Sequence, residues 1–151
     1  MKTVLVVLVV VLHLAQCAET SLPNFVIFYA DDAGYGDFGF MGHPTINTPA
    51  LDKLAAKSLR YTQHYTGAPI CSPSRGSLLT GRLPVRNGVY TSFQWPEDNG
   101  FRVFYPTSTG SLMHTENTLQ QELKGAGYMN GIIGKWHLGH HNKSLPTERG
   151  F

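Results

Sequence analysis

The segment that most restricts the fold of this chain is the apolar run of residues 24–30, Asn-Phe-Val-Ile-Phe-Tyr-Ala, between Pro23 and Asp31. Its length is that of one β-strand, and apolar and polar side chains do not alternate along it. A strand that is apolar on both faces needs a packed layer on each side, as a central strand of a parallel sheet has. The run therefore predicts a buried strand in a layered α/β domain.

A helix and a second extended segment are expected next along the chain. Thr48 supplies an N-cap before Pro49, and apolar side chains recur on one side of residues 49–59. The expected buried side consists of Leu51, Leu54, Ala55 and Leu59. Residues 60–66 then look like a second extended segment.

The residues after Cys71 predict another helix. Ser72 followed by Pro73 is typical of an N-cap and a first helical residue. Residues 77–79 continue the helical pattern, and Gly81 marks its end. This prediction places Cys71 at a helix N-terminus.

A last helix and strand are expected near the end of the chain. Thr118 with Gln121 resembles a capping box, and the helix would end at Gly125 or Gly127. Its expected buried side chains are Leu119, Leu123 and Ala126. Residues 128–134 then form a further candidate strand. Strands that alternate with helices indicate an α/β architecture with a largely parallel sheet, whose ligands bind beyond the carboxyl ends of the strands.

Composition narrows the class of protein and of partner. Hydrophobic residues make up 42% of the chain and charged residues 15%, a balance typical of a globular protein. The net charge of +2 is too small to favour nucleic acid or a membrane surface as the main partner. The seven histidines show no spacing typical of a zinc site.

The N-terminus predicts a chain that leaves the cytosol. A lysine at the second position precedes the apolar run Val4–Leu12, which is typical of a signal peptide and too short to cross a bilayer. We expect residues 1–17 to be the signal peptide, with cleavage after Ala18 as an alternative. Leu14–Cys17 also resembles, less well, the lipid-attachment box of a bacterial lipoprotein. Either way, Cys71 becomes the only free cysteine.

A lone cysteine in a secreted chain suggests a reactive or modified side chain, because secreted proteins use cysteines in pairs. A buried free thiol is the alternative. Unpaired N–H groups at a helix N-terminus favour an anion, and Arg75 adds a cation about one turn after Cys71. We therefore expect an anion to lie above Cys71.

Two of the predicted strands end in charged residues. The first runs into Asp31 and Asp32, adjacent carboxylates that repel each other unless a cation lies between them, and their hard oxygens suit Ca²⁺ or Mg²⁺ rather than zinc. An aspartate that caps a turn is the alternative. The last strand leads to Lys135 and His137, which would point the same way in an extended segment and reach one ligand. A solvated lysine and a surface histidine are the alternative.

The stretch Gly34–Gly39 matches the GxGxxG pattern of dinucleotide-binding proteins and follows a predicted strand. That pattern should open a helix whose N-terminus holds a pyrophosphate. Residues 40–44, Phe-Met-Gly-His-Pro, do not suit the start of a helix, and the preceding aspartates would repel phosphate. Nucleotide binding is therefore disfavoured.

Three segments together resemble the signature motifs of type I sulfatases. Residues 71–75, Cys-Ser-Pro-Ser-Arg, with residues 79–82, Leu-Thr-Gly-Arg, are similar to the first signature. Residues 28–37 are similar to the metal-binding strand, and residues 134–139, Gly-Lys-Trp-His-Leu-Gly, to the second signature. Residues 42–44 and 81–86 are supporting details that are similar to the branch of arylsulfatase A and the N-acetylgalactosamine-sulfate sulfatases.

The resemblance implies an alkaline-phosphatase-like sulfatase fold, in which helices flank a largely parallel central sheet. It also implies that a formylglycine-generating enzyme oxidises Cys71 in the endoplasmic reticulum to formylglycine, which explains why this cysteine has no partner. One hydroxyl of the hydrated aldehyde would attack the sulfur of a sulfate ester, and the other would later expel sulfate.

The same resemblance gives the other candidate residues their roles. Asp31 and Asp32 would bind one Ca²⁺ together with residue 71, and Mg²⁺ is the less favoured ion. Arg75 would stabilise the hydrate and the sulfate oxygens. Lys135 would bind sulfate, and His137 would assist deprotonation of the hydroxyl that attacks sulfur.

The resemblance implies that residues 18–151 are the N-terminal part of a sulfatase catalytic domain, because the family draws further ligands from sequence that would follow Phe151. We therefore expect an incomplete domain with little activity of its own, from a parent protein that hydrolyses aryl, glycolipid or glycosaminoglycan sulfates. A non-catalytic secreted protein on a truncated sulfatase scaffold is one alternative. A metal-dependent phosphatase or phosphonate hydrolase is another, although such enzymes often have serine or threonine where this chain has Cys71.

The secretory route would lead to the lysosome or to the extracellular space. Residues 142–144, Asn-Lys-Ser, form an N-glycosylation sequon that such a route makes meaningful. The aromatic loop of residues 92–111 would help to shape the mouth of the active-site pocket.

Overall fold

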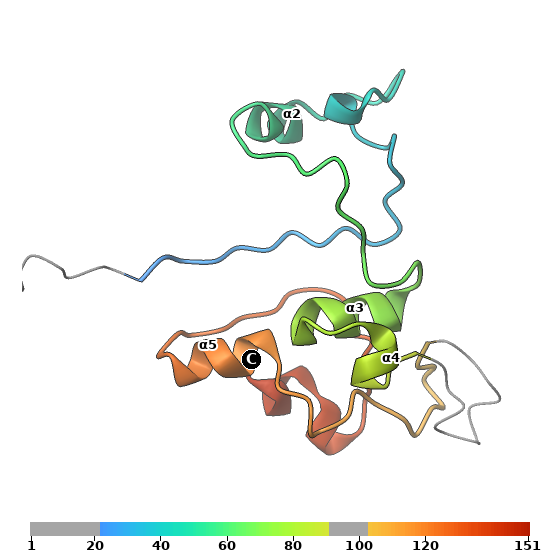
Figure 1. Cartoon of the computed structure of the whole chain (residues 1–151), viewed down its shortest axis with the longest axis vertical. Helices are drawn as coiled ribbons and strands as arrows, with labels where there is room; N and C mark the ends of the chain where they lie inside the picture. Colours follow the sequence, from blue (N-terminus) through green and yellow to red (C-terminus); the bar gives the residue numbers. More distant parts are fainter. Residues whose placement is uncertain (1–21, 91–102) are drawn as a thin grey trace, which may run out of the picture. The chain divides into compact units, whose positions relative to one another are not determined.

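A computed structural model of the chain describes residues 22–90 and 103–151 (Figure 1). The chain divides into two compact units, Met1–Ala30 and Asp31–Phe151. The expected signal peptide of residues 1–17 lies outside the described residues. So do three aromatic residues of the expected pocket loop, Phe93, Trp95 and Phe101. Within the described ranges, no helix is long and apolar enough to cross a membrane.

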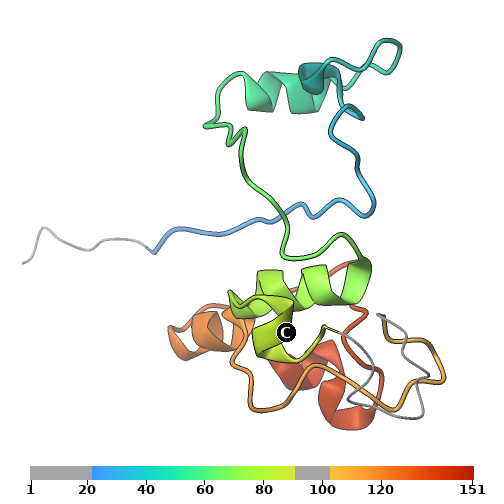
Figure 2. The same cartoon turned by 45° about the vertical axis from the view of Figure 1, so that its right-hand side comes forward.

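Short helices joined by long irregular segments make up the second unit. Its α-helices are α2 (Pro49–Ala55), α3 (Cys71–Thr80), α4 (Pro84–Asn87) and α5 (Leu119–Gly125). Its 3₁₀-helices are η1 (Gly39–Met41), η4 (Asn142–Ser144) and η5 (Pro146–Arg149). Helices α3 and α4 lie side by side in both views (Figures 1 and 2).

The predicted strands form no ladder among the described residues. Residues 24–30, 60–66 and 128–134 are all assigned to turns, bends or irregular backbone. In the first segment Phe28 is 88% exposed, and in the last Ile133 is fully exposed, so neither is covered on both faces as a central strand would be. The sheet therefore stays a prediction for this part of the chain.

Helix α2 confirms the predicted helix, with Thr48 as its N-cap and Pro49 as its first residue. It ends at Ala55, earlier than the expected end at residue 59. The predicted buried side is wrong in the structure, because Leu51 is 40% exposed and Leu54 is 58% exposed. Helix geometry here comes from local signals, whereas burial needs an apolar partner surface that the described residues do not place over these leucines.

Helix α3 begins two residues earlier than the prediction, which placed the N-cap at Ser72 and the first helical residue at Pro73. Ile70 is the N-cap residue and Cys71 is the first residue of the helix. The Ser72 hydroxyl does not cap the helix; it accepts a hydrogen bond of 3.2 Å from the backbone N–H of Phe104. The predicted end is confirmed, since Gly81 takes the left-handed conformation with a φ of 64°.

A small apolar core forms within the second unit, between α3 and later segments of the chain. Val89, Phe104, Leu112 and Leu138 are buried, and Leu79 of α3 and Trp136 pack against them. The backbone N–H of Leu112 donates to the carbonyl of Leu138 at 3.0 Å. The segment that contains the second sulfatase-like motif is thus anchored next to α3.

Helix α5 confirms the capping box, because the side chain of Gln121 accepts hydrogen bonds from the backbone N–H and the hydroxyl of Thr118. The predicted apolar stripe is wrong: Leu119 is 39% exposed. The buried residues at this end are instead Thr118 and Gln120. The amide of Gln120 donates to the carbonyl oxygen of Arg149, which also lies 3.3 Å from the Thr118 hydroxyl. Polar contacts rather than an apolar layer therefore fix this helix to the end of the chain.

Candidate active site

Helix α3 places two of the predicted site residues one turn apart. Cys71 is half-buried at the first position, and the side chain of Arg75 is only 11% exposed. The guanidinium of Arg75 donates to the backbone carbonyl of Lys135 at 2.6 Å and to the carboxylate of Asp31 at 3.2 Å. A single arginine thus joins three segments that lie far apart in the sequence.

Lys135 completes this cluster. Its ammonium group lies 3.0 Å from one carboxylate oxygen of Asp31 and 3.2 Å from the sulfur of Cys71. Arg75 contacts the other oxygen of the same carboxylate. The structure therefore brings Asp31, Cys71, Arg75 and Lys135 into direct contact.

Two cations on one carboxylate change how these groups hold protons. The hydrogen bond from Lys135, followed by that from Arg75, lowers the pKa of Asp31 below its ordinary value. The hydrogen bond to Asp31, followed by that to Cys71, raises the pKa of Lys135. Asp31 is thus held as a carboxylate and Lys135 as an ammonium at neutral pH.

Asp32 brings a second carboxylate to the same place. One potential ligand atom from each of Asp31, Asp32 and Cys71 lies within 4.8 Å of the other two. The backbone of Asp32 takes a φ of 58°, a left-handed conformation that is uncommon outside glycine. Two carboxylates gathered at this spacing fit a hard divalent cation, and they supply part of the six to eight oxygens that Ca²⁺ takes.

His137 lies beside this cluster in a different arrangement from the predicted one. Its φ of 58° breaks the extended geometry that would point Lys135 and His137 the same way. The imidazole Nε2 lies 2.7 Å from the carbonyl oxygen of Phe104, so its hydrogen bond goes to this backbone group and not to Cys71. Burial lowers the pKa of His137 below its ordinary value, which favours the neutral ring.

The hydrogen bond to Phe104 fixes the tautomer of that neutral ring. A carbonyl oxygen only accepts, so Nε2 carries the proton and Nδ1 keeps its lone pair. Nδ1 is buried and has no hydrogen-bond partner in the described part of the chain. His137 therefore keeps an unpaired acceptor atom in the interior of the described part of the chain.

Phe104 and Ser72 are the residues that the sequence analysis missed. The backbone N–H of Phe104 donates to the hydroxyl of Ser72, and its carbonyl accepts from His137. Ser72 adjoins Cys71 on α3, so one peptide backbone links the helix of the cysteine to the histidine. Hydrogen bonds to the backbone of Phe104 cannot be predicted from the pattern of side-chain types along the sequence.

Comparisons with known proteins identify the family of the chain. The family model described as Sulfatase matches residues 23–151. The chain belongs to the sulfatase family. It is 47% identical to arylsulfatase A of Bos taurus over 139 residues, which is 91% of this chain and 25% of that protein. It is 50% identical to arylsulfatase G of Homo sapiens over 129 residues, 85% of this chain and 22% of that protein. The identity to N-acetylgalactosamine-6-sulfatase of Rattus norvegicus is 44% over 130 residues, 85% of this chain and 24% of the relative.

Solved structures support the same family. The crystal structure of Ps i-CgsB matches with a TM-score of 0.70 and 33% identity, and it covers 80% of this chain and 25% of that chain. Its complex with k-i-k-neocarrahexaose matches equally well, at 32% identity. These similarities support an alkaline-phosphatase-like sulfatase fold. The chain spans about a quarter of the length of the relatives it matches.

Proposed function

We propose that residues 18–151 are the first part of a sulfatase catalytic domain and contribute part of the active site of a sulfuric ester hydrolase. The observation that supports it best is the contact of Lys135 with both Asp31 and Cys71, because these three residues belong to the three different sulfatase-like motifs. Membership of the sulfatase family supports the choice of a sulfate ester as substrate.

Two groups would complete the chemistry. Oxidation of Cys71 to formylglycine would supply a hydrated aldehyde as nucleophile at the first position of α3. Asp31, Asp32 and residue 71 would hold Ca²⁺, which would supply positive charge toward the sulfate oxygens. The carboxylates of Asp31 and Asp32 fit the cation, whereas the positive charges of Lys135 and Arg75 suit the anionic sulfate ester.

The chain's own residues would bind the sulfate and move the proton. Lys135 and Arg75 place two positive charges next to Cys71, where they would hold the anionic sulfuryl group and offset the charge that develops on its oxygens. The backbone N–H groups at the start of α3 add to this positive environment. His137, neutral and with Nδ1 free to accept, would take the proton of the attacking hydroxyl.

The ligand count sets an expectation for the isolated chain. Ca²⁺ takes about six to eight oxygens, and the described residues gather three potential ligands at this site. We therefore expect weak calcium binding and little turnover from these 151 residues alone. A non-catalytic role on the sulfatase scaffold stays an alternative for this reason.

The compartment and the substrate class follow the family. A secretory route through the endoplasmic reticulum would bring Cys71 to the formylglycine-generating enzyme, and the lysosome or the extracellular space would be its destination. Relatives named for an N-acetylgalactosamine sulfate and for aryl sulfates support sugar or aryl sulfates as candidate substrates, and a glycolipid sulfate is a further candidate.

Selective binding of a sulfate ester tests the proposal. The chain is produced in a secretory host, and calorimetry measures binding of an aryl sulfate and of the matching aryl phosphate, with and without calcium. We expect calcium-dependent binding that prefers the sulfate, and we expect Lys135→Gln to weaken it because the ammonium next to Cys71 is lost.

A preference for the phosphate would instead support a phosphatase. Equal binding of the aryl sulfate by the unsubstituted chain and by Lys135→Gln would contradict the proposed site. Robust sulfate ester turnover by the unsubstituted 151-residue chain would show that the expectation of an inactive fragment is wrong.

A further inference from the structure

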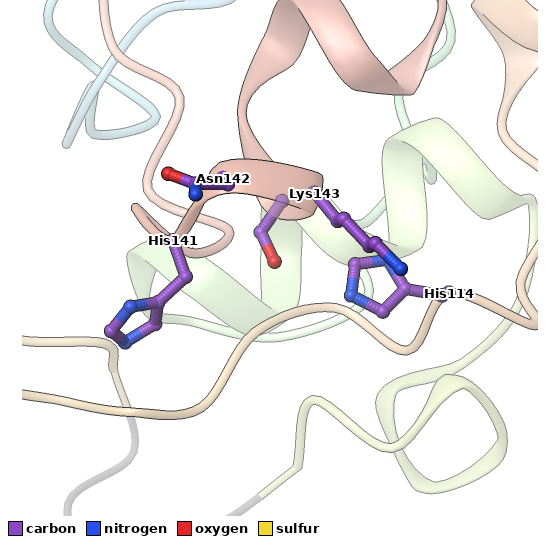
Figure 3. A pocket seen from close by; sticks show the side chains of 5 residues that line it. His114, His141, Asn142 and Lys143 are labelled. Atoms are coloured by element: carbon purple, nitrogen blue, oxygen red, sulfur yellow. The ribbon is translucent and has the colours of Figure 1, made fainter.

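An open pocket of about 350 Å³ lies away from the site of Cys71 and Lys135, around η4 (Figure 3). Its lining consists of His114, His141, Asn142, Lys143 and Ser144. Figure 3 shows Asn142 and His141 on one side of the short helix and Lys143 and His114 on the other. Three of the lining residues, Asn142 to Ser144, form the sequence pattern Asn-x-Ser.

The amide of Asn142 differs from the amides of the structural asparagines. Asn87 donates its amide to the Thr80 hydroxyl and to a backbone carbonyl, and Asn130 donates to two backbone carbonyls. Asn142 is exposed, and its side chain makes no hydrogen bond within the described residues. The amide of Asn142 is thus available at the surface, whereas the other two are needed by the fold.

The pattern occurs once in the chain. Each other asparagine has a residue other than serine or threonine two positions later, such as Pro49 after Asn47 or Leu119 after Asn117. Lysine at the middle position satisfies the requirement that proline be absent there. The one asparagine with an acceptor sequence is therefore also one whose amide is exposed and unused.

We propose that Asn142 is N-glycosylated. In this step the side-chain amide nitrogen of Asn142 forms a bond to the anomeric carbon of the first sugar of a lipid-linked oligosaccharide diphosphate. The bond from that carbon to the diphosphate oxygen breaks, the lipid diphosphate leaves with the electron pair, and a basic group of the transferring enzyme takes one proton from the amide nitrogen. No oxidant or reductant takes part. The inference rests on the secretory route of the proposed function and on no other part of it.

The structure also assigns an order to this event. Ser144 is 3% exposed, its backbone N–H donates to His141, and its carbonyl accepts from the indole of Trp136. An enzyme that must recognise the serine hydroxyl would reach it only before this segment folds. Glycosylation therefore precedes folding, and the attached sugar then stands at the rim of the pocket beside His141.

The test uses the 151-residue chain in a mammalian secretory host, with a C-terminal tag that contains a second, accessible sequon. Peptide-N-glycosidase digestion followed by mass spectrometry reads each site, because the enzyme converts a glycosylated asparagine into aspartate. We expect a glycan on Asn142 and on the tag. Asn142→Gln and Ser144→Ala should each remove one glycan and keep that of the tag, and Ser144→Thr should retain both.

Each other outcome has a clear meaning. A glycan on the tag with an unmodified Asn142 would overturn the inference. A chain without either glycan would contradict the secretory route, and the inference would fall with it. The same digest also shows whether residue 71 is modified, so the two proposals can be tested independently. Formylglycine at position 71 with an unmodified Asn142 would refute only the glycosylation. A glycan on Asn142 with an intact thiol at position 71 would refute only the proposed chemistry.

Discussion

The hydroxyl of Ser72 offers a sharp test of how the site is held, because it acts through the backbone of Phe104 on His137. Ser72 is fully buried and accepts a hydrogen bond of 3.2 Å from the Phe104 N–H. The carbonyl of the same residue accepts from His137 at 2.7 Å. Ser72→Ala removes the acceptor and keeps the β-carbon, so the helix retains its packing.

The cost of this substitution follows from the donor that it leaves behind. A buried N–H without a partner typically costs about 1–3 kcal/mol of stability, more than the net value of the lost hydrogen bond. We therefore expect Ser72→Ala to lower the free energy of unfolding by that amount. Looser packing of Phe104 should also admit water to His137, and the pKa of this histidine should rise toward its ordinary value of 6.5.

Ser77 of the same helix is a matched control. Its hydroxyl oxygen is buried and has no hydrogen-bond partner in the described part of the chain. Ser77→Ala removes a polar atom that is already unsatisfied, so its effect should stay within about 0.5 kcal/mol or be stabilising. Urea denaturation followed by circular dichroism measures both variants, and NMR titration of the histidine ring measures the pKa.

Equal destabilisation by the two alanine substitutions would refute this reasoning. If the pKa of His137 is unchanged in Ser72→Ala, the hydrogen bond of Ser72 affects only stability, and Phe104 does not transmit its loss to His137.

Three further predictions concern the core, the metal ligands and the response to pH. Leu138→Ala should lower the free energy of unfolding by about 2–5 kcal/mol in urea, because this side chain is fully buried in the core; a loss below about 1 kcal/mol would contradict that packing. Calcium should raise the melting temperature of the parent more than that of Asp32→Asn, since an ion that binds only the folded form stabilises it; equal shifts would exclude Asp32 as a ligand. Burial lowers the pKa of His137, so the unfolded chain binds more protons below pH 6.5 and stability should fall as the pH falls through that range. His137→Gln should flatten this slope, and an unchanged slope would assign it to other groups.

The helices could be predicted because their ends have local chemical causes. Proline follows the N-cap of α2, glycine in the left-handed conformation ends α3, and a threonine–glutamine box begins α5. Each signal acts over a few residues and needs no partner from elsewhere in the chain. The start of α3 lies two residues before the predicted one, because the Ser72 hydroxyl does not cap the helix but accepts a hydrogen bond from the N–H of Phe104, which is distant in the sequence.

Burial and the sheet could not be predicted in the same way. An apolar run such as residues 24–30 indicates that a strand there would have to be buried on both faces. Whether it pairs with other strands and is covered by helices depends on segments distant in the sequence. The polar burial around Arg149 was missed for the same reason, because its carbonyl and guanidinium serve groups on other segments.

The candidate site falls between these cases. Side chains with distinctive chemistry, namely Asp31, Cys71, Arg75 and Lys135, were predicted to meet and do meet. His137 was predicted as a member of the site, but the direction of its ring depends on a left-handed backbone conformation and on a carbonyl from the loop of Phe104. Neither feature has a residue-type signature at position 137 itself.

The chemical fate of residue 71 tests the central claim most directly. The chain is secreted from a mammalian host without alkylation, and mass spectrometry weighs the peptide of residues 61–82. The account predicts a peptide about 18 Da lighter than the cysteine form, as replacement of the thiol by an aldehyde requires, and an unmodified serine peptide from Cys71→Ser. An intact thiol at position 71 in a secreted, correctly processed chain would contradict the account.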